Sequence, residues 1–178
     1  MSDPKPKLNE TTSIEERICS IIRSVPNQLE AGLGDTPWTE AVRKPLLELG
    51  ESLGFDTCPS SCNCGWLYDL VWYENDASGQ LKSVPLVLES EWGKQYHKIK
   101  YDFEKLLVAK ATYKVMVFQA CGDRMRDYFK RMKAGIQAFG GPKGNETYLL
   151  ACFDERRWVF EIETERTSTP VEFGCPSV

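Results

Sequence analysis

Histidine is nearly absent from this chain, since His97 is the only one among 178 residues. Metalloproteases of the HExxH type and multi-histidine zinc hydrolases need several imidazoles, so both classes are excluded. The chain also lacks a run of about 18 apolar residues, so no transmembrane helix and no membrane partner are expected. Residues 1–12 (MSDPKPKLNETT) are polar and lack the apolar core of a signal peptide, which predicts a disordered tail on a cytoplasmic protein.

Cysteine, by contrast, is plentiful, with seven residues in the chain. In a reducing compartment these are expected to be thiols or metal ligands and not disulfides. Three of them, Cys58, Cys62 and Cys64, lie in the stretch CPSSCNCG and are a candidate structural zinc site. Their spacing matches no common zinc motif, and a fourth ligand would have to come from a distant cysteine. We therefore expect a loop of reduced thiols, with zinc as the alternative.

The formal net charge is −4, which does not indicate a nucleic-acid partner. Residues 93–133, however, hold eleven basic and four acidic side chains, whereas the rest of the chain holds eleven basic and twenty-two acidic ones. This segment is either a pair of ordinary solvated helices or a surface that binds phosphate. The candidate nucleic-acid-binding residues in it are Lys94, Lys98, Lys100, Arg126, Lys130 and Lys133.

Two helices are predicted at the start of the chain. Ser13 and Glu16 are spaced as a capping box, and isoleucines follow at helical spacing. Thr36 is predicted to cap a second helix that ends before Gly54. Pro45 lies inside this second helix and predicts a kink or a break there.

The rest of the chain alternates between strand and helix patterns. A strand pair joined by the turn NDASGQ is followed by helix, strand, helix and a final strand pair. This order predicts one α/β domain with a mixed sheet over residues 13–178. The expected elements are strands 66–74 and 84–92, helix 102–111, strand 113–120, helix 123–139, and strands 147–154 and 157–165.

Three carboxylates interrupt the first strand pair. Asp69 lies in the apolar stretch WLYDLVW, and Glu89 and Glu91 alternate in VPLVLESEW, so that both emerge on one face of their strand. Burying an unpaired carboxylate costs several kcal/mol. Alternating glutamates are usually a solvent face, but the residues before Glu89 are apolar on both faces, which favours a site.

Oxygen ligands of this kind favour a hard divalent cation, Mg²⁺ above all, or Mn²⁺. Such an ion takes substrate phosphate as a further ligand and activates a bound water for attack. The three carboxylates therefore indicate a site that hydrolyses phosphodiester bonds.

At these residues the sequence resembles the PD-(D/E)xK nuclease superfamily of restriction-endonuclease-like proteins. The family pattern is an acid on one core strand, a hairpin turn, and (D/E)-x-K on the next strand. Asp69 matches the first acid and Glu89 the second, while Glu91 stands where the family usually has lysine. The chain therefore looks like the E-x-E variant of the motif.

The resemblance implies that the missing lysine has moved to a later position. Lys105 is favoured, with Lys94 as the alternative, and Asp102 is expected to orient Lys105 as its i, i+3 partner. Family members often add a glutamate from the first core helix, for which Glu48 is the candidate, with Glu40 and Glu51 as alternatives. The implied catalytic residues are Asp69, Glu89, Glu91 and Lys105, and the implied metal ligands are Asp69, Glu89, Glu91 and Glu48.

The expectation is thus a single restriction-endonuclease-like α/β domain, with its core over about residues 38–118, that hydrolyses DNA with Mg²⁺ or Mn²⁺. The alternative is a degenerate nuclease-fold module that binds nucleic acid or a protein without cleaving. A third reading is a metal-stabilised scaffold for a protein partner. The choice between DNA and RNA stays open, as does the oligomeric state, a homodimer included.

Overall fold

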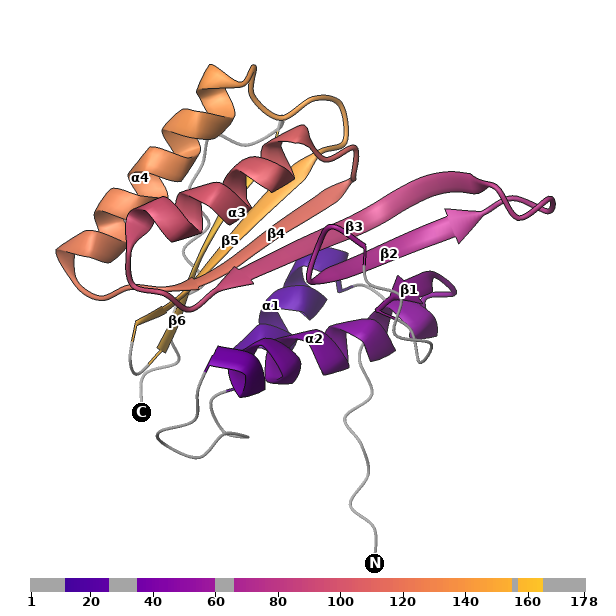
Figure 1. The fold of residues 1–178 in the computed structure, drawn as a ribbon, viewed down its shortest axis with the longest axis horizontal. Helices are drawn as coiled ribbons and strands as arrows, with labels where there is room; N and C mark the ends of the chain where they lie inside the picture. Colours follow the sequence, from indigo (N-terminus) through magenta and orange to yellow (C-terminus); the bar gives the residue numbers. More distant parts are fainter. Residues whose placement is uncertain (1–11, 26–34, 60–65, 155–156, 165–178) are drawn as a thin grey trace, which may run out of the picture.

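The computed structural model describes residues 12–25, 35–59, 66–154 and 157–164, and it shows a six-stranded mixed sheet with helices on both faces (Figure 1). The strands lie side by side in chain order, from β1 to β6. The elements are α1 (Ile14–Ser24), α2 (Asp35–Ser52), β1 (Asp56–Cys58), β2 (Leu70–Asn75), β3 (Leu81–Glu91), α3 (Tyr96–Val108), β4 (Tyr113–Gln119), α4 (Asp123–Ala138), β5 (Thr147–Asp154) and β6 (Arg157–Thr164).

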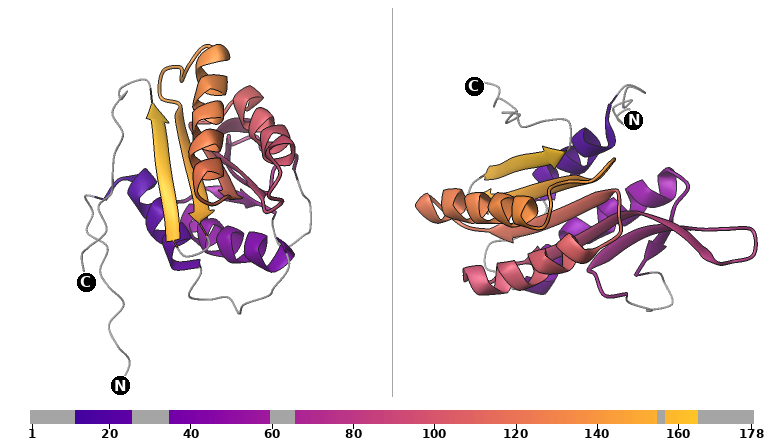
Figure 2. Two further views of the ribbon diagram at one scale, coloured as in Figure 1. Left: turned by 90° about the vertical axis from the view of Figure 1, so that its left-hand side faces the viewer. Right: turned by 90° about the horizontal axis from the view of Figure 1, so that it is seen from above.

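The sheet is antiparallel at its two sides and parallel in its centre. Strands β1, β2 and β3 form an antiparallel meander, β3, β4 and β5 run parallel, and β6 pairs antiparallel with β5. The two parallel connections run through α3 and α4, which lie on one face of the sheet, while α1 and α2 lie on the other (Figures 1 and 2). The β2–β3 hairpin extends beyond the helices (Figure 2).

Each face of the sheet has its own hydrophobic core, as the alternation of strand side chains requires. Val71, Val87 and Met116 pack with α3 and α4, whereas their neighbours Leu88 and Val115 pack with α1 and α2. The helix residues of the first core include Ile99, Phe103, Leu106, Met125, Phe129, Met132 and Ile136. The expected helix 123–139 is therefore confirmed as α4, and its apolar residues form its buried side.

The two N-terminal helices agree with the sequence in part. The capping box of α1 is confirmed, because Ser13 Oγ accepts from the Glu16 amide and Glu16 Oε2 accepts from the Ser13 amide. Helix α2 begins at Asp35, so Thr36 is inside the helix and is not its cap. The helix continues through Pro45 and is not split there.

Several boundaries differ from those predicted, including the start of β3, which is at Leu81 and not at residue 84. Strand β1 lies in a stretch expected to be loop, β2 begins only at Leu70, and α3 starts at Tyr96, before the predicted residue 102. Asp69 therefore precedes its strand by one residue. The predicted tail over residues 1–12 and the cysteines Cys62 and Cys64 lie outside the described residues, apart from Thr12.

Two further features of the described chain concern its cysteines and the length of its helices. Cys19, Cys121 and Cys152 are thiols and form no disulfide. No helix in the described segments is both long and apolar enough to cross a lipid bilayer.

Candidate active site

Asp69 and Glu89 both follow the end of the β2–β3 ladder. Leu70 and Leu88 are its last pair, Asp69 is the residue before Leu70, and Glu89 is the residue after Leu88. Glu89 belongs to the same face of β3 as Val87, which packs against α3 and α4. The Glu89 residue is only 2% exposed, although it is a carboxylic acid. A charge in such a position needs a partner.

Lys105 of α3 is that partner. Its Nζ lies 2.7 Å from Glu89 Oε1 and 2.8 Å from Asp102 Oδ1, so that one ammonium group joins two carboxylates. Helix α3 turns Ile99, Phe103 and Leu106 into the core, which leaves Asp102 and Lys105 at the margin of the helix above β3. The predicted i, i+3 pairing of Asp102 with Lys105 is confirmed, and Lys105, not Lys94, is the lysine that reaches Glu89.

Burial raises the pKa of Glu89 to about 8, even though the hydrogen bond and charge of Lys105 lower it. The charges of Asp69 and Asp102 raise this pKa further. For Lys105, burial alone lowers the pKa, but the hydrogen bonds and charges of Asp102 and Glu89 outweigh burial and raise it above its ordinary value. The lysine is therefore a fixed cation, while the carboxyl group of Glu89 changes charge near neutral pH.

Asp69 is bound to β3 through Ser90, the residue that follows Glu89. Its Oδ2 accepts hydrogen bonds from the Ser90 amide at 2.8 Å and from Ser90 Oγ at 2.7 Å. Ser90 Oγ lies 3.1 Å from Thr39 Oγ1 of α2, and Thr39 Oγ1 accepts from Trp92 Nε1 at 3.0 Å. The carboxylate of Asp69 is thus anchored through Ser90 to α2, next to Glu89 but not in contact with Lys105.

The structure does not bring Glu91 or Glu48 to this pair. Glu91 Oε1 accepts from the Gly93 amide at 2.5 Å, which turns its side chain toward the loop after β3. Glu48 is exposed on α2, which covers the opposite face of the sheet from Glu89. Within the described ranges, no group of three or more Asp, Glu, His or Cys side chains is arranged to hold a metal ion. The three carboxylates of the hairpin therefore do not form one ligand set.

The six candidate nucleic-acid-binding residues do not form one continuous track toward Glu89. Lys94, Lys98 and Lys100 are exposed around the β3–α3 connection and the first turns of α3. Lys133 instead pairs with Glu161 of β6 at 2.5 Å, three strands away from β3. The other two candidates on α4, Arg126 and Lys130, are exposed, and Arg126 is paired with Asp123.

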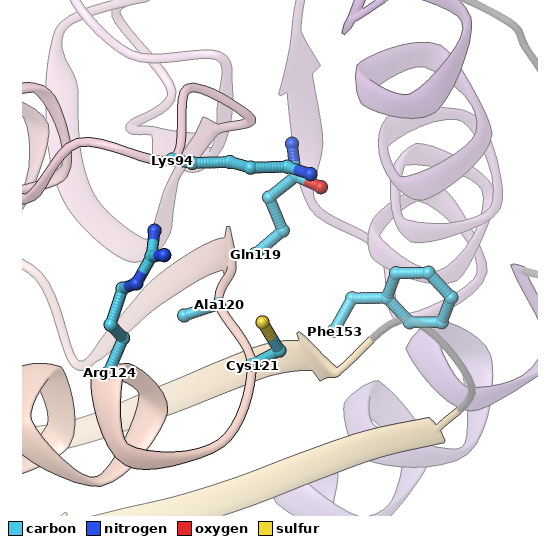
Figure 3. Close-up of a pocket in the computed structure, with 6 residues that line it drawn as sticks. All are labelled: Lys94, Gln119, Ala120, Cys121, Arg124 and Phe153. Carbon is cyan, nitrogen blue, oxygen red and sulfur yellow. The ribbon is translucent and has the colours of Figure 1, made fainter.

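A small cavity lies at the carboxyl ends of β4 and β5, beside the β3–α3 loop (Figure 3). Its volume is about 20 Å³, enough for one water molecule. Lys94 and Arg124 approach it from two different elements, with Cys121 and Gln119 between them (Figure 3). This cavity adds Arg124 to the cations near the β3–α3 loop but is too small to be a substrate site.

Sequence reasoning missed two side chains close to the pair. Lys114 is buried on β4, where its Nζ donates to Tyr148 Oη at 3.0 Å and lies 3.1 Å from Glu146 Oε2. The sequence could have indicated Lys114, because it is the one charged residue in the apolar stretch YKVMVFQA. Tyr68 packs against the core of α3 and α4, and burial, followed by the charge of Glu89, raises its pKa.

The chain was compared with protein families, curated proteins and solved structures. No protein-family model, no curated protein and no solved structure matches the chain. The site is therefore interpreted from its own residues.

Proposed function

We propose that this protein is a metal-dependent nuclease that hydrolyses DNA phosphodiester bonds at Asp69, Glu89 and Lys105. The observation that carries the proposal is the contact between Lys105 Nζ and Glu89 Oε1. It places a lysine next to Glu89, the second acid of the motif, although Glu91 occupies the position where the motif usually has lysine. The arrangement of α2, the β1–β2–β3 meander, α3 and the parallel strand β4 supports the restriction-endonuclease-like fold as part of the same proposal.

Two carboxylates are enough for the proposed Mg²⁺ or Mn²⁺. Magnesium in phosphoryl-transfer sites is often bound by one or two carboxylates and completes its shell with waters and substrate phosphate. The charge of Asp69 acts on Glu89, and Ser90 uses only Oδ2 of Asp69, which fits this limited ligand set. When bound there, the ion would activate a water and neutralise charge on the phosphorus.

The protein's own groups have separate roles in this proposal. Glu89 must lose its proton before it can bind a cation, because only the carboxylate is a ligand. Lys105 donates a hydrogen bond to the attacking water or to a phosphate oxygen, and Asp102 keeps its Nζ in place once Glu89 is engaged. Ser90 and Thr39 orient the carboxylate of Asp69.

The test is a cleavage assay on supercoiled plasmid and on single-stranded DNA, with Mg²⁺ or Mn²⁺. The wild-type protein should cleave at least one of them, and Glu89→Gln and Lys105→Ala should each lower the rate by about 100-fold or more. Glu161→Gln and Lys133→Ala are matched controls, because they remove an ion pair of similar length on β6 and α4. Their rates should stay close to that of the wild-type protein.

An absence of cleavage by the wild-type protein with either ion would favour the degenerate module, which shares the fold and lacks the activity. Equal losses in the Glu89 and Glu161 variants would show that the effect is structural. The cytoplasmic location and the homodimer stay predictions that this assay does not address.

A further inference from the structure

One aromatic and one aliphatic side chain are exposed on the side of α3 that holds Lys105. Tyr101 lies one turn before Lys105 and is 69% exposed, and its ring centroid is 5.8 Å from Lys105 Nζ. Val108, one turn after Lys105, is also exposed. Tyr101, Lys105 and Val108 thus follow one another at i, i+4 and i+7 along a single stripe of the helix.

A second exposed aromatic group lies on the segment that leads into β2. Trp66 is 42% exposed and stacks on Tyr73, with ring centroids 5.0 Å apart, while Leu67 is 83% exposed. Tyr73 packs against the same core as α3. Its side chain therefore points to the same face of the sheet as Glu89, and the Trp66–Tyr73 stack lies on that face. Tyr68, which is partly buried, continues the segment toward Glu89.

These residues are unusual on the surface of the molecule. Six large hydrophobic side chains are exposed in the described chain, and four of them lie either on α3, which holds Lys105, or on the segment before β2, which holds Asp69: Trp66, Leu67, Tyr101 and Val108. Burial would be favourable for such side chains, so a cluster of them beside a charged site marks a surface that contacts a partner.

The neighbouring charges say what kind of partner this surface fits. Lys105 lies beside the Tyr101 ring, and Lys98 and Lys94 are exposed at the start of the same helix and in the loop before it. Aromatic rings that alternate with cations are the arrangement by which proteins bind single-stranded nucleic acid, with bases on the rings and phosphates on the lysines. In a duplex the bases are already stacked on one another, so exposed rings have no base face to contact.

We propose that the proposed nuclease site takes single-stranded nucleic acid, with unpaired bases stacked on Tyr101 and, further along the strand, on Trp66, while a phosphate next to the Tyr101 base contacts Lys105. The inference rests on the proposed function for the role of Lys105, but the binding it describes can be measured without cleavage. It assigns Tyr101 and Trp66 to substrate binding and leaves the chemistry to Glu89 and Asp69.

The experiment measures the fluorescence anisotropy of an end-labelled oligothymidylate of about 12 nucleotides, with full-length protein and without divalent metal, so that nothing is cleaved. The same measurement uses a labelled duplex of equal length. The variants are Tyr101→Ala, Tyr101→Phe and Trp66→Ala. Phe139→Ala is the matched control, because Phe139 is a half-exposed ring at the far end of α4.

We expect the single strand to bind at least about tenfold more tightly than the duplex, and Tyr101→Ala and Trp66→Ala each to weaken its binding by about tenfold. Tyr101→Phe keeps the ring and should bind like the wild-type protein, as should Phe139→Ala. The intrinsic fluorescence of Trp66 should be quenched on binding, and this part of the signal should be missing in Trp66→Ala.

Duplex binding as tight as single-strand binding, or equal losses in the Tyr101→Ala and Phe139→Ala variants, would overturn this inference and leave the cleavage proposal standing. Aromatic-dependent binding of the single strand without any metal-dependent cleavage would overturn the cleavage proposal and keep this inference. Retained binding in both Tyr101→Ala and Trp66→Ala would also overturn the inference.

Discussion

Glu89 is the residue on which the site depends, because its carboxyl group lies in the core and has an ammonium group as its partner. Lys105 Nζ contacts Glu89 Oε1, yet burial still holds the pKa of Glu89 at about 8. A buried ion pair of this kind contributes little net stability, since the desolvation of both charges offsets their attraction. The pair is therefore weak evidence for stability.

The first prediction concerns pH and Glu89. Its pKa is about 8 in the folded protein and about 4.5 in an unfolded chain, so between these values the folded state binds more protons at Glu89. The free energy of unfolding should therefore fall as pH rises through this window, by up to roughly 5 kcal/mol. Urea unfolding at several pH values should show this slope in the wild-type protein and a shallower slope in Glu89→Gln. Equal slopes in both proteins would contradict a raised pKa.

The second prediction concerns Lys105. Lys105→Ala removes the cation and leaves Glu89 buried without a partner, which should lower the free energy of unfolding by about 3 kcal/mol above pH 8. The double variant Glu89→Gln, Lys105→Met should recover most of this loss, because neither buried charge remains. Lys133→Ala breaks a more exposed pair and should cost less than about 1 kcal/mol. A similar loss in Lys133→Ala and Lys105→Ala would show that burial of the pair is unimportant.

At the scale of elements, helix α2 positions one side of the site by its close approach to the sheet. Trp72 Nε1 donates to the Leu46 carbonyl at 3.0 Å, and Gly50 faces the same indole ring. Thr39, near the start of this helix, lies 3.1 Å from Ser90 Oγ, which in turn holds Asp69. The distance between α2 and β2 therefore bears on the orientation of Asp69.

The third prediction tests this packing. A Cβ at position 50 would lie 2.5 Å from Trp72 Nε1, so Gly50→Ala should push α2 away from the sheet and lower the free energy of unfolding by about 2 kcal/mol. Gly135→Ala on α4 is the comparison, because its added Cβ would lie 3.2 Å from the end of the Phe103 ring. Chemical denaturation should show a clearly smaller loss for Gly135→Ala, and the reverse order would contradict this account of α2.

At the scale of the whole molecule, the two faces of the sheet meet at β3. Glu89 faces α3, and Ser90 and its partner Asp69 are held from the α2 side, so a cation between Asp69 and Glu89 would link both cores. A ligand that binds only the folded state raises its stability by mass action. Metal binding should therefore be visible as thermal stabilisation of the entire domain.

The fourth prediction is this thermal shift. Millimolar Mn²⁺ should raise the Tm of the wild-type protein in differential scanning fluorimetry by a few degrees, more strongly above pH 8, where Glu89 is ionised. Glu89→Gln should abolish most of the shift, whereas Glu91→Ala should keep it, because Glu91 is engaged with the Gly93 amide. The absence of a shift in the wild-type protein would mean that Asp69 and Glu89 do not hold a metal.

Much of the fold was predictable because local patterns carry it. The periodicity of the buried side chains predicted α4 and the central strands, and the capping box marked the start of α1. The sequence also singled out Asp69 and Glu89, since a charge in an apolar strand needs compensation. Lys105 and Asp102 came instead from the family resemblance, which implied a lysine at a later position. It missed β1, whose three residues are too few to show a period.

What only the tertiary structure decided is which of these charges meet. The alternation of strand side chains predicted Glu89 and Glu91 on one face. In the structure Glu91 accepts a hydrogen bond from the Gly93 amide, and its side chain points away from Glu89. Glu48 and Lys133 have the right charge and lie far from Glu89, because α2 covers the other face and β6 is at the other edge of the sheet. Periodicity states which side of an element a residue occupies, whereas partners are set by how separate elements pack, and that depends on contacts between residues far apart in the chain.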